Sequence, residues 1–123
     1  MTLKSHPVQK KLLWLISICL IVLWSGAVFA QEAKITMINV LIEGTKIWLP
    51  SAVTAKEGEK VTLKLVNKLD KPHGFFIPAL DIKVVVKENE TKEIVFQAPD
   101  AGSYEIKCHL HAAHLGGVLF ITK

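Results

Sequence analysis

The chain gathers most of its metal-binding residue types into one short segment. Three of its five histidines, His109, His111 and His114, fall within six residues and directly follow Cys108. A fourth, His73, lies further upstream, between a proline and a glycine and next to two phenylalanines. A thiolate and several imidazoles that converge on one point form a site for a borderline or soft transition metal. The sequence therefore predicts a metal site built from two distant stretches of chain.

Each of these residues also has a simpler interpretation. A single cysteine at the end of a strand is commonly a small buried apolar residue, and histidines in loops are commonly solvated polar groups. Their joint occurrence, four histidines and one cysteine in 93 residues with nearly all of them in one loop, favours metal binding. An inward-pointing thiolate would also be costly to bury without a cation.

Residues 1–30 differ from the rest of the chain and have the pattern of an export signal. Three lysines precede an uncharged stretch over residues 12–31, and residues 28–30 read Val-Phe-Ala, which suits signal peptidase. An uncleaved anchor is the alternative, because about 20 uncharged residues can just span a bilayer. In both cases we expect residues 31–123 to work in the periplasm or another extracytoplasmic space, and to meet a membrane only if the leader is retained.

The composition of residues 31–123 fits one small domain. These residues hold 12 lysines and 11 acidic residues, a formal charge of +1, so most of the +4 of the whole chain belongs to the leader. Charge therefore gives no support for nucleic-acid binding. Ninety-three residues are too few for a multidomain enzyme, and no arrangement typical of a hydrolase or a transferase is found in the sequence.

The elements that must position the histidines and the cysteine are short strands. Residues 60–66 alternate apolar and polar side chains, and Tyr104, Ile106 and Cys108 share one face of a further run. Polar turns separate about seven such strands, which predicts an all-β antiparallel Greek-key sandwich or barrel. The expected strands cover residues 35–41, 46–49, 60–66, 82–86, 92–96, 103–108 and 117–122, and residues 74–77 form a short apolar segment.

Several segments resemble the cupredoxins, the small copper proteins that include plastocyanin and amicyanin. They are VTLKLVN over residues 61–67, HGF over 73–75 and AGSYEIKC over 101–108, followed by the histidine loop. The segment HGFFIP, from residue 73, also resembles nitrosocyanin and the periplasmic domain of cytochrome oxidase subunit II. The resemblance covers roughly residues 50–123. It implies a cupredoxin-like sandwich for residues 31–123.

The resemblance also implies a set of copper ligands. His73 falls on the upstream histidine of the family, Cys108 and His111 on its cysteine and second histidine, and His114 on its axial methionine. Residue 112 is alanine, where an oxidase-type dinuclear centre would need a second cysteine. One mononuclear copper is therefore implied.

Two further points follow for the loop. His109 is expected to be a surface residue, because a side chain that directly follows Cys108 along a strand points away from the thiolate. Zinc is the competing metal, since a tetrahedral set of one cysteine and three histidines suits it. The affinity order of the divalent ions favours copper, and copper is available outside the cytoplasm.

The expected function is one-electron transfer between redox partner proteins, by a copper site with histidine in place of the axial methionine. Imidazole binds Cu(II) better than a thioether does, so a lowered reduction potential is expected. The alternative is a nitrosocyanin-like, non-blue copper protein that binds or converts a small molecule such as nitric oxide. Copper storage or delivery is less favoured, because delivery sites are usually exposed and rich in methionine.

Overall fold

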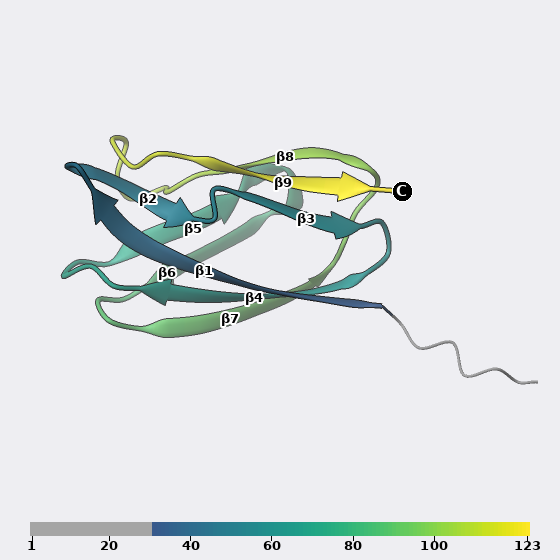
Figure 1. Ribbon diagram of the computed structural model, residues 1–123, viewed down its shortest axis with the longest axis horizontal. Helices are drawn as coiled ribbons and strands as arrows, with labels where there is room; N and C mark the ends of the chain where they lie inside the picture. Colours follow the sequence, from purple (N-terminus) through teal and green to yellow (C-terminus); the bar gives the residue numbers. More distant parts are fainter. Residues whose placement is uncertain (1–30) are drawn as a thin grey trace, which may run out of the picture.

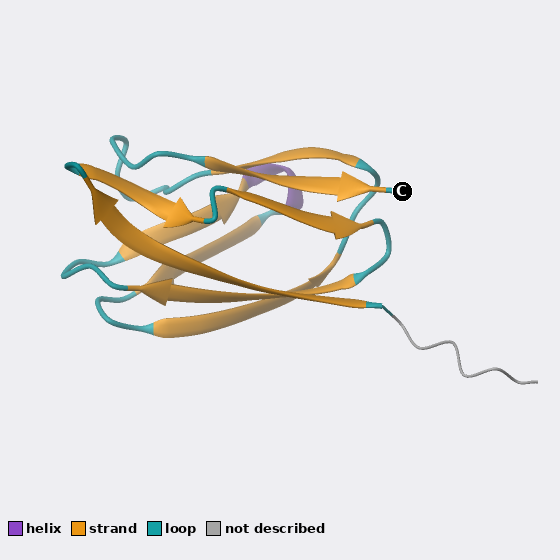
Figure 2. Ribbon diagram, viewed as in Figure 1, coloured by secondary structure: helices purple, strands orange, loops and turns teal. Residues whose placement is uncertain are grey.

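A computed structural model of the protein describes residues 31–123, and the leader expected over residues 1–30 lies outside the described residues. The described part consists of nine strands and one 3₁₀ turn (Figures 1 and 2). No helix among residues 31–123 is long and apolar enough to span a membrane. The elements are β1 (Glu32–Ile42), β2 (Thr45–Leu49), β3 (Ala52–Lys56), β4 (Lys60–Asn67), β5 (His73–Ile77), η1 (Pro78–Leu80), β6 (Ile82–Val86), β7 (Thr91–Gln97), β8 (Gly102–Ile106) and β9 (Gly117–Thr122).

The strands form two facing layers. One layer has the strand order β2-β1-β4-β7, and the other has the order β3-β9-β8 (Figure 1). The hairpin β5-β6 joins the second layer, because the backbones of Phe76 and Lys107 exchange two hydrogen bonds of 2.9 and 2.8 Å. The predicted all-β sandwich is confirmed.

Two of the strand pairs are parallel, so the expectation of a purely antiparallel sandwich is wrong. β1 runs parallel to β4, from the pair Glu32–Lys60 to the pair Asn39–Asn67. β3 runs parallel to β9, and β3 itself is not among the predicted strands. Alternation of apolar and polar residues shows which side chains face the core. It carries no information about which strand lies alongside, or in which direction.

The core lies between the two layers and consists of the inward faces of the strands. In β4, Val61, Leu63 and Leu65 are fully buried while Lys64 is exposed, as the alternation predicts. Burial of one such aliphatic side chain stabilises a protein by roughly 1.5–3 kcal/mol. The other fully buried apolar residues are Met37, Phe75, Ile77, Val86 and Leu119, and Ile106 is 1% exposed.

The two ends of the sandwich carry different parts of the chain. The β8–β9 loop, the β1–β2 turn and the start of β5 lie at one end, and the start of β1 and the end of β9 lie at the other (Figure 1). At the first end, the Leu115 N–H donates a 2.9 Å hydrogen bond to the Lys46 carbonyl. This contact ties the loop that carries the histidines to β2.

Asn67, the last residue of β4, connects several segments at that same end. Its amide nitrogen donates to the carbonyls of Lys71, Val86 and Lys87, and its oxygen accepts from the Leu69 N–H and from Asn39. The side chain is fully buried, so these partners replace water. Asn67 therefore holds the β4–β5 loop against the end of β6.

We expect Asn67→Ala to lower the free energy of unfolding by roughly 3–5 kcal/mol, because it leaves several buried polar groups without partners. Urea denaturation of the two proteins measures the difference. Gln97→Ala is the matched control, since the Gln97 amide makes a single exposed hydrogen bond to the Gly58 carbonyl. A loss no greater for Asn67→Ala than for Gln97→Ala would contradict the assignment.

Candidate metal centre

Two segments that are distant in the sequence meet at the loop end of the sandwich. His73 is the first residue of β5, and Cys108 lies just beyond β8, two residues after its end at Ile106. The Phe76–Lys107 backbone hydrogen bonds hold β5 beside the extension of β8. Strand pairing therefore fixes His73 and Cys108 side by side before any metal is considered.

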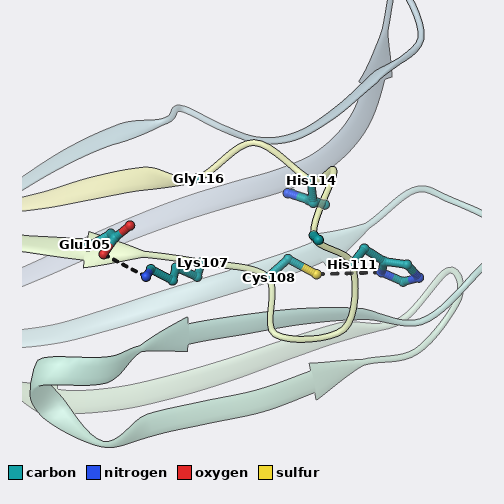
Figure 3. A pocket seen from close by; sticks show the side chains of 7 residues that line it. Glu105, Lys107, Cys108, His111, His114 and Gly116 are labelled. Carbon is teal, nitrogen blue, oxygen red and sulfur yellow. Dashed lines mark hydrogen bonds and ion pairs between the residues drawn. The ribbon is translucent and has the colours of Figure 1, made fainter.

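Three of the four predicted ligands form one cluster. One donor atom each from His73, Cys108 and His111 lies within 4.8 Å of the others. The Cys108 Sγ atom is 3.7 Å from His111 Nδ1 (Figure 3), and the rings of His73 and His111 have centroids 4.5 Å apart. One thiol and two imidazoles at this spacing match the donor set of a trigonal copper site.

His73 provides the sharpest test of whether a metal fits. Its side chain is fully buried, and neither ring nitrogen has a hydrogen-bond partner among the described residues. Buried polar atoms are nearly always paired, so two unpaired imidazole nitrogens need an explanation. A metal ion bound to one of them accounts for that nitrogen, because the cation takes the lone pair that the protein leaves free.

The pKa of His73 is lowered from 6.5 to about 4. Burial is the main cause, because it penalises the charged ring, and positive charge on the neighbouring His111 and His114 adds to the effect. At neutral pH the ring is therefore uncharged and holds a lone pair for a metal. A metal ligand must be in this deprotonated form.

This pKa predicts that the metal-free protein loses stability in acid. Between pH 6.5 and about 4 the unfolded chain binds the His73 proton and the folded chain does not, so stability falls as the pH falls. We expect a loss of roughly 1–3 kcal/mol over this range. Urea denaturation of the chelator-treated protein at several pH values measures it. A His73→Gln variant that kept the full pH dependence would contradict this origin.

The Cys108 sulfur receives a hydrogen bond from the backbone. The Gly74 N–H donates to Cys108 Sγ at 3.2 Å, and the Trp48 indole N–H donates to the Gly74 carbonyl at 3.1 Å. A donor aimed at the sulfur stabilises the thiolate, the form that binds metals. Trp48 is buried in β2, so a core residue of the first layer holds Gly74, the residue whose N–H contacts the sulfur.

His109 lies outside the cluster and packs against Gly74. A Cβ atom added to Gly74 would lie 2.5 Å from His109 Nδ1, so glycine is needed for this close approach. The His109 ring stands edge-on to Phe76, with centroids 5.9 Å apart. Burial and the nearby charge of Lys83 lower its pKa. The ring is half-buried, where the sequence predicted a surface residue.

His114, the predicted axial ligand, is only 6% exposed and lies near the cluster. Its ring centroid is 5.3 Å from that of His73 and 6.4 Å from that of Trp48. Its Nδ1 atom lies 2.9 Å from the Leu115 carbonyl oxygen, and its Nε2 atom lies 2.8 Å from Asn39 Oδ1. The three-residue cluster does not include it. Its role as a ligand therefore stays a prediction.

A pocket of about 270 Å³ opens beside the cluster (Figure 3). An ion pair of 3.1 Å between Glu105 and Lys107 stands on its wall, and both side chains are largely exposed. The pocket reaches three of the predicted ligands, so a small molecule from solvent could approach a bound metal there. The lining residues are Glu105, Lys107, Cys108, His111, Ala112, His114 and Gly116.

Sequence reasoning did not identify the residues that surround the cluster. It did not find the Gly74 N–H that contacts the sulfur, the Trp48 indole, or the Asn39–Asn67 pair. One signal for the pair was present: Asn39 and Asn67 occupy inward positions of their strands, two residues after Met37 and Leu65. A polar residue at a strand position that the alternation assigns to the core is the sequence signal for such a buried hydrogen-bonded pair.

A β-sandwich that unites one thiol and two imidazoles at a strand end defines a class of small metal proteins. The chain belongs to the cupredoxin-like domain family, whose model matches residues 13–121. Two curated relatives are nitrous-oxide reductases. The protein from Ralstonia nicotianae is 42% identical over 66 residues, and that from Cupriavidus necator is 39% identical. The aligned region is 49% of this chain and 10% of each enzyme.

Solved structures with the same fold include two auracyanins. Auracyanin from Roseiflexus castenholzii superposes with a TM-score of 0.62 at 15% identity, over 76% of this chain and 100% of that one. Auracyanin A, a "blue" copper protein from Chloroflexus aurantiacus, gives 0.61 at 18% identity, over 74% and 99%. Copper nitrite reductase from Nitrosomonas europaea gives 0.61 at 19% identity, over 74% and 41%. These likenesses show the cupredoxin fold of the chain.

Proposed function

We propose that the protein is an exported mononuclear copper protein that acts in one-electron transfer. The proposed ligands are His73, Cys108 and His111, with His114 as the axial donor. The observation that carries the proposal is the buried His73 ring, whose two unpaired nitrogens lie beside the only cysteine among residues 31–123. Copper held there would supply a one-electron couple between Cu(I) and Cu(II).

The surroundings of the cluster support an electron carrier. Strand pairing places His73 and Cys108, the Gly74 N–H contacts the sulfur, and Leu115 ties the loop to β2. A site held by backbone contacts changes its geometry little when the charge of the bound ion changes. The reorganisation energy of electron transfer is therefore small. Outer-shell contacts of this kind orient the ligands of a metal site.

The loop also offers a docking surface for a redox partner protein. Ala112, Ala113 and Leu115 are exposed around His111, and Leu115 is 53% exposed. A small apolar patch beside a ligand suits brief, weak contact with a partner. The export-signal pattern of residues 1–30 supports an extracytoplasmic location, where such partners and copper would be met.

Absorption and EPR spectra of the copper-loaded protein, followed through one cycle of reduction and reoxidation, test this proposal. We expect a thiolate-to-copper band in the visible region that disappears on one-electron reduction and returns on oxidation. Zinc loaded in parallel gives no such band. A protein that binds zinc tightly and copper weakly, or that shows no visible band with copper, would overturn the proposal.

The pocket beside Cys108, His111 and His114 favours a second candidate function, the binding or conversion of a small molecule such as nitric oxide. Azide and nitric oxide titrated into the Cu(II) protein discriminate between the two functions. An electron carrier with all coordination positions filled keeps its spectrum, whereas a small-molecule site shows a saturable change. Lys107→Ala, at the pocket wall, would alter the azide affinity only in the second case.

A further inference from the structure

A row of buried amides connects the β4–β5 loop to His114. Asn67 contacts Asn39, and Asn39 contacts His114 Nε2. Both asparagines are fully buried, on the parallel strands β4 and β1, where they form the last pair of the register. The three side chains are therefore one hydrogen-bonded unit inside the protein.

The orientation of Asn67 is determined by its backbone partners. Its Nδ2 group faces three carbonyl oxygens, at 2.7 to 3.2 Å, and its Oδ1 atom faces the Leu69 N–H at 3.1 Å. The opposite orientation of the amide would set its oxygen against three oxygens and its NH₂ group against an N–H. Only one orientation satisfies the network.

The orientation of Asn39 follows from that of Asn67. Asn39 Nδ2 donates to Asn67 Oδ1 at 3.2 Å, so the Asn39 oxygen points the other way, to His114 Nε2 at 2.8 Å. An oxygen at this position can only accept. His114 Nε2 must therefore carry the proton to make this hydrogen bond.

A second acceptor competes for the proton of His114. The Leu115 carbonyl lies 2.9 Å from Nδ1, and a neutral imidazole has one N–H to give. Leu115 is an exposed loop residue, whereas Asn39 is fully buried. The contact to the Leu115 carbonyl is only partly buried, so water can replace it more readily. The contact to Asn39 is buried, and an Asn39 oxygen without its donor bears the full cost of desolvation. The single N–H of the neutral His114 ring is therefore expected on Nε2, where it donates to Asn39.

We propose that Asn39, oriented by Asn67, is a positioning residue that keeps the His114 imidazole in the Nε2–H form. Nδ1 is then the nitrogen that keeps the lone pair, and it is the atom through which His114 would bind copper once it turns from the Leu115 carbonyl. This inference rests on the proposed copper site for the identity of the metal. It adds that Asn39 determines which His114 nitrogen is available to the metal. In metal-binding histidines the second ring nitrogen is commonly held by an outer partner.

The metal-free protein tests the tautomer directly. Long-range ¹H–¹⁵N correlation spectra of the ¹⁵N-labelled, chelator-treated protein at neutral pH distinguish the two forms of His114. We expect the Nε2–H form to exceed the Nδ1–H form by at least about tenfold, as one satisfied buried hydrogen bond implies. A predominant Nδ1–H form would overturn the proposal. This measurement needs no variant, so poor folding of a mutant cannot obscure it.

A pair of variants of equal size tests the role toward copper. Asn39→Thr keeps a hydroxyl that can accept a hydrogen bond on the His114 side, whereas Asn39→Val has the same shape without the hydroxyl. We expect Asn39→Val to lose the preference for Nε2–H and to change the EPR spectrum and reduction potential of the copper protein, with partial recovery in Asn39→Thr.

The outcomes separate this inference from the proposed function. Identical tautomer ratios and copper spectra in wild type and Asn39→Val would make Asn39 merely structural and overturn the inference. A wild-type protein with the Nε2–H tautomer but no thiolate-to-copper band would instead overturn the proposed function. In that case the hydrogen-bond unit would stand as a feature of the metal-free fold.

Discussion

Replacement of Cys108 by alanine is expected to abolish the visible absorption of the copper-loaded protein. Cys108 is the only thiol among residues 31–123, and the visible band of such a site arises from thiolate-to-copper charge transfer. Copper affinity should fall at least about a hundredfold, because loss of an outer-shell partner alone costs 10- to 100-fold. Copper titration against a competing chelator measures the affinity, and absorption spectra report the band.

His109→Gln is the control for the cysteine variant. It removes a neighbouring imidazole that packs on Gly74 and lies outside the cluster, so it should retain the band and most of the affinity. Cys108→Ala with an unchanged visible spectrum would mean that the absorbing metal is bound elsewhere. Loss of the band in His109→Gln would make His109 a ligand, contrary to its place against Phe76.

Substitution of His114 by methionine is expected to raise the reduction potential by more than about 60 mV, which is more than a tenfold change in the relative affinities for Cu(I) and Cu(II). A thioether is a soft, weak donor that favours Cu(I), whereas imidazole favours Cu(II). The colour should also move toward the intense blue of ordinary cupredoxins. Protein-film voltammetry and absorption spectra measure both changes.

The same substitution at the neighbouring histidine, His109→Met, is the matched control and should leave the potential within a few tens of millivolts of wild type, well under the roughly 60 mV that a tenfold change requires. An unchanged potential in His114→Met would remove His114 from the ligand set. The buried ring would then serve to satisfy Asn39 and to pack near Trp48.

The features that were predictable from the sequence are those that leave a local pattern. Alternation in residues 60–66 identified β4, and the inward face shared by Tyr104 and Ile106 identified β8. The run of histidines after Cys108, together with His73 in its apolar setting, predicted a metal site, and the resemblance to the cupredoxins implied the three residues that the structure brings together. These patterns follow from the period of a strand and from the chemistry of the donors.

The features that were not predictable depend on which segments become neighbours. Parallel pairing of β1 with β4 places Asn39 opposite Asn67, and neither residue shows this contact in its own segment. The Gly74 N–H reaches Cys108 only because β5 lies beside the extension of β8. Every residue except proline carries the same main-chain N–H, so the sequence does not show which of them contacts the sulfur.

The distance of the start of β1 and the end of β9 from the histidine loop has a practical consequence. β1 starts and β9 ends at the end of the sandwich opposite the β8–β9 loop (Figure 1). A linker fused after Lys123 would attach the protein to a gold or graphite electrode with the loop turned toward solution. Such immobilisation preserves access by soluble reaction partners, and it makes the domain a convenient unit for biosensor fusions.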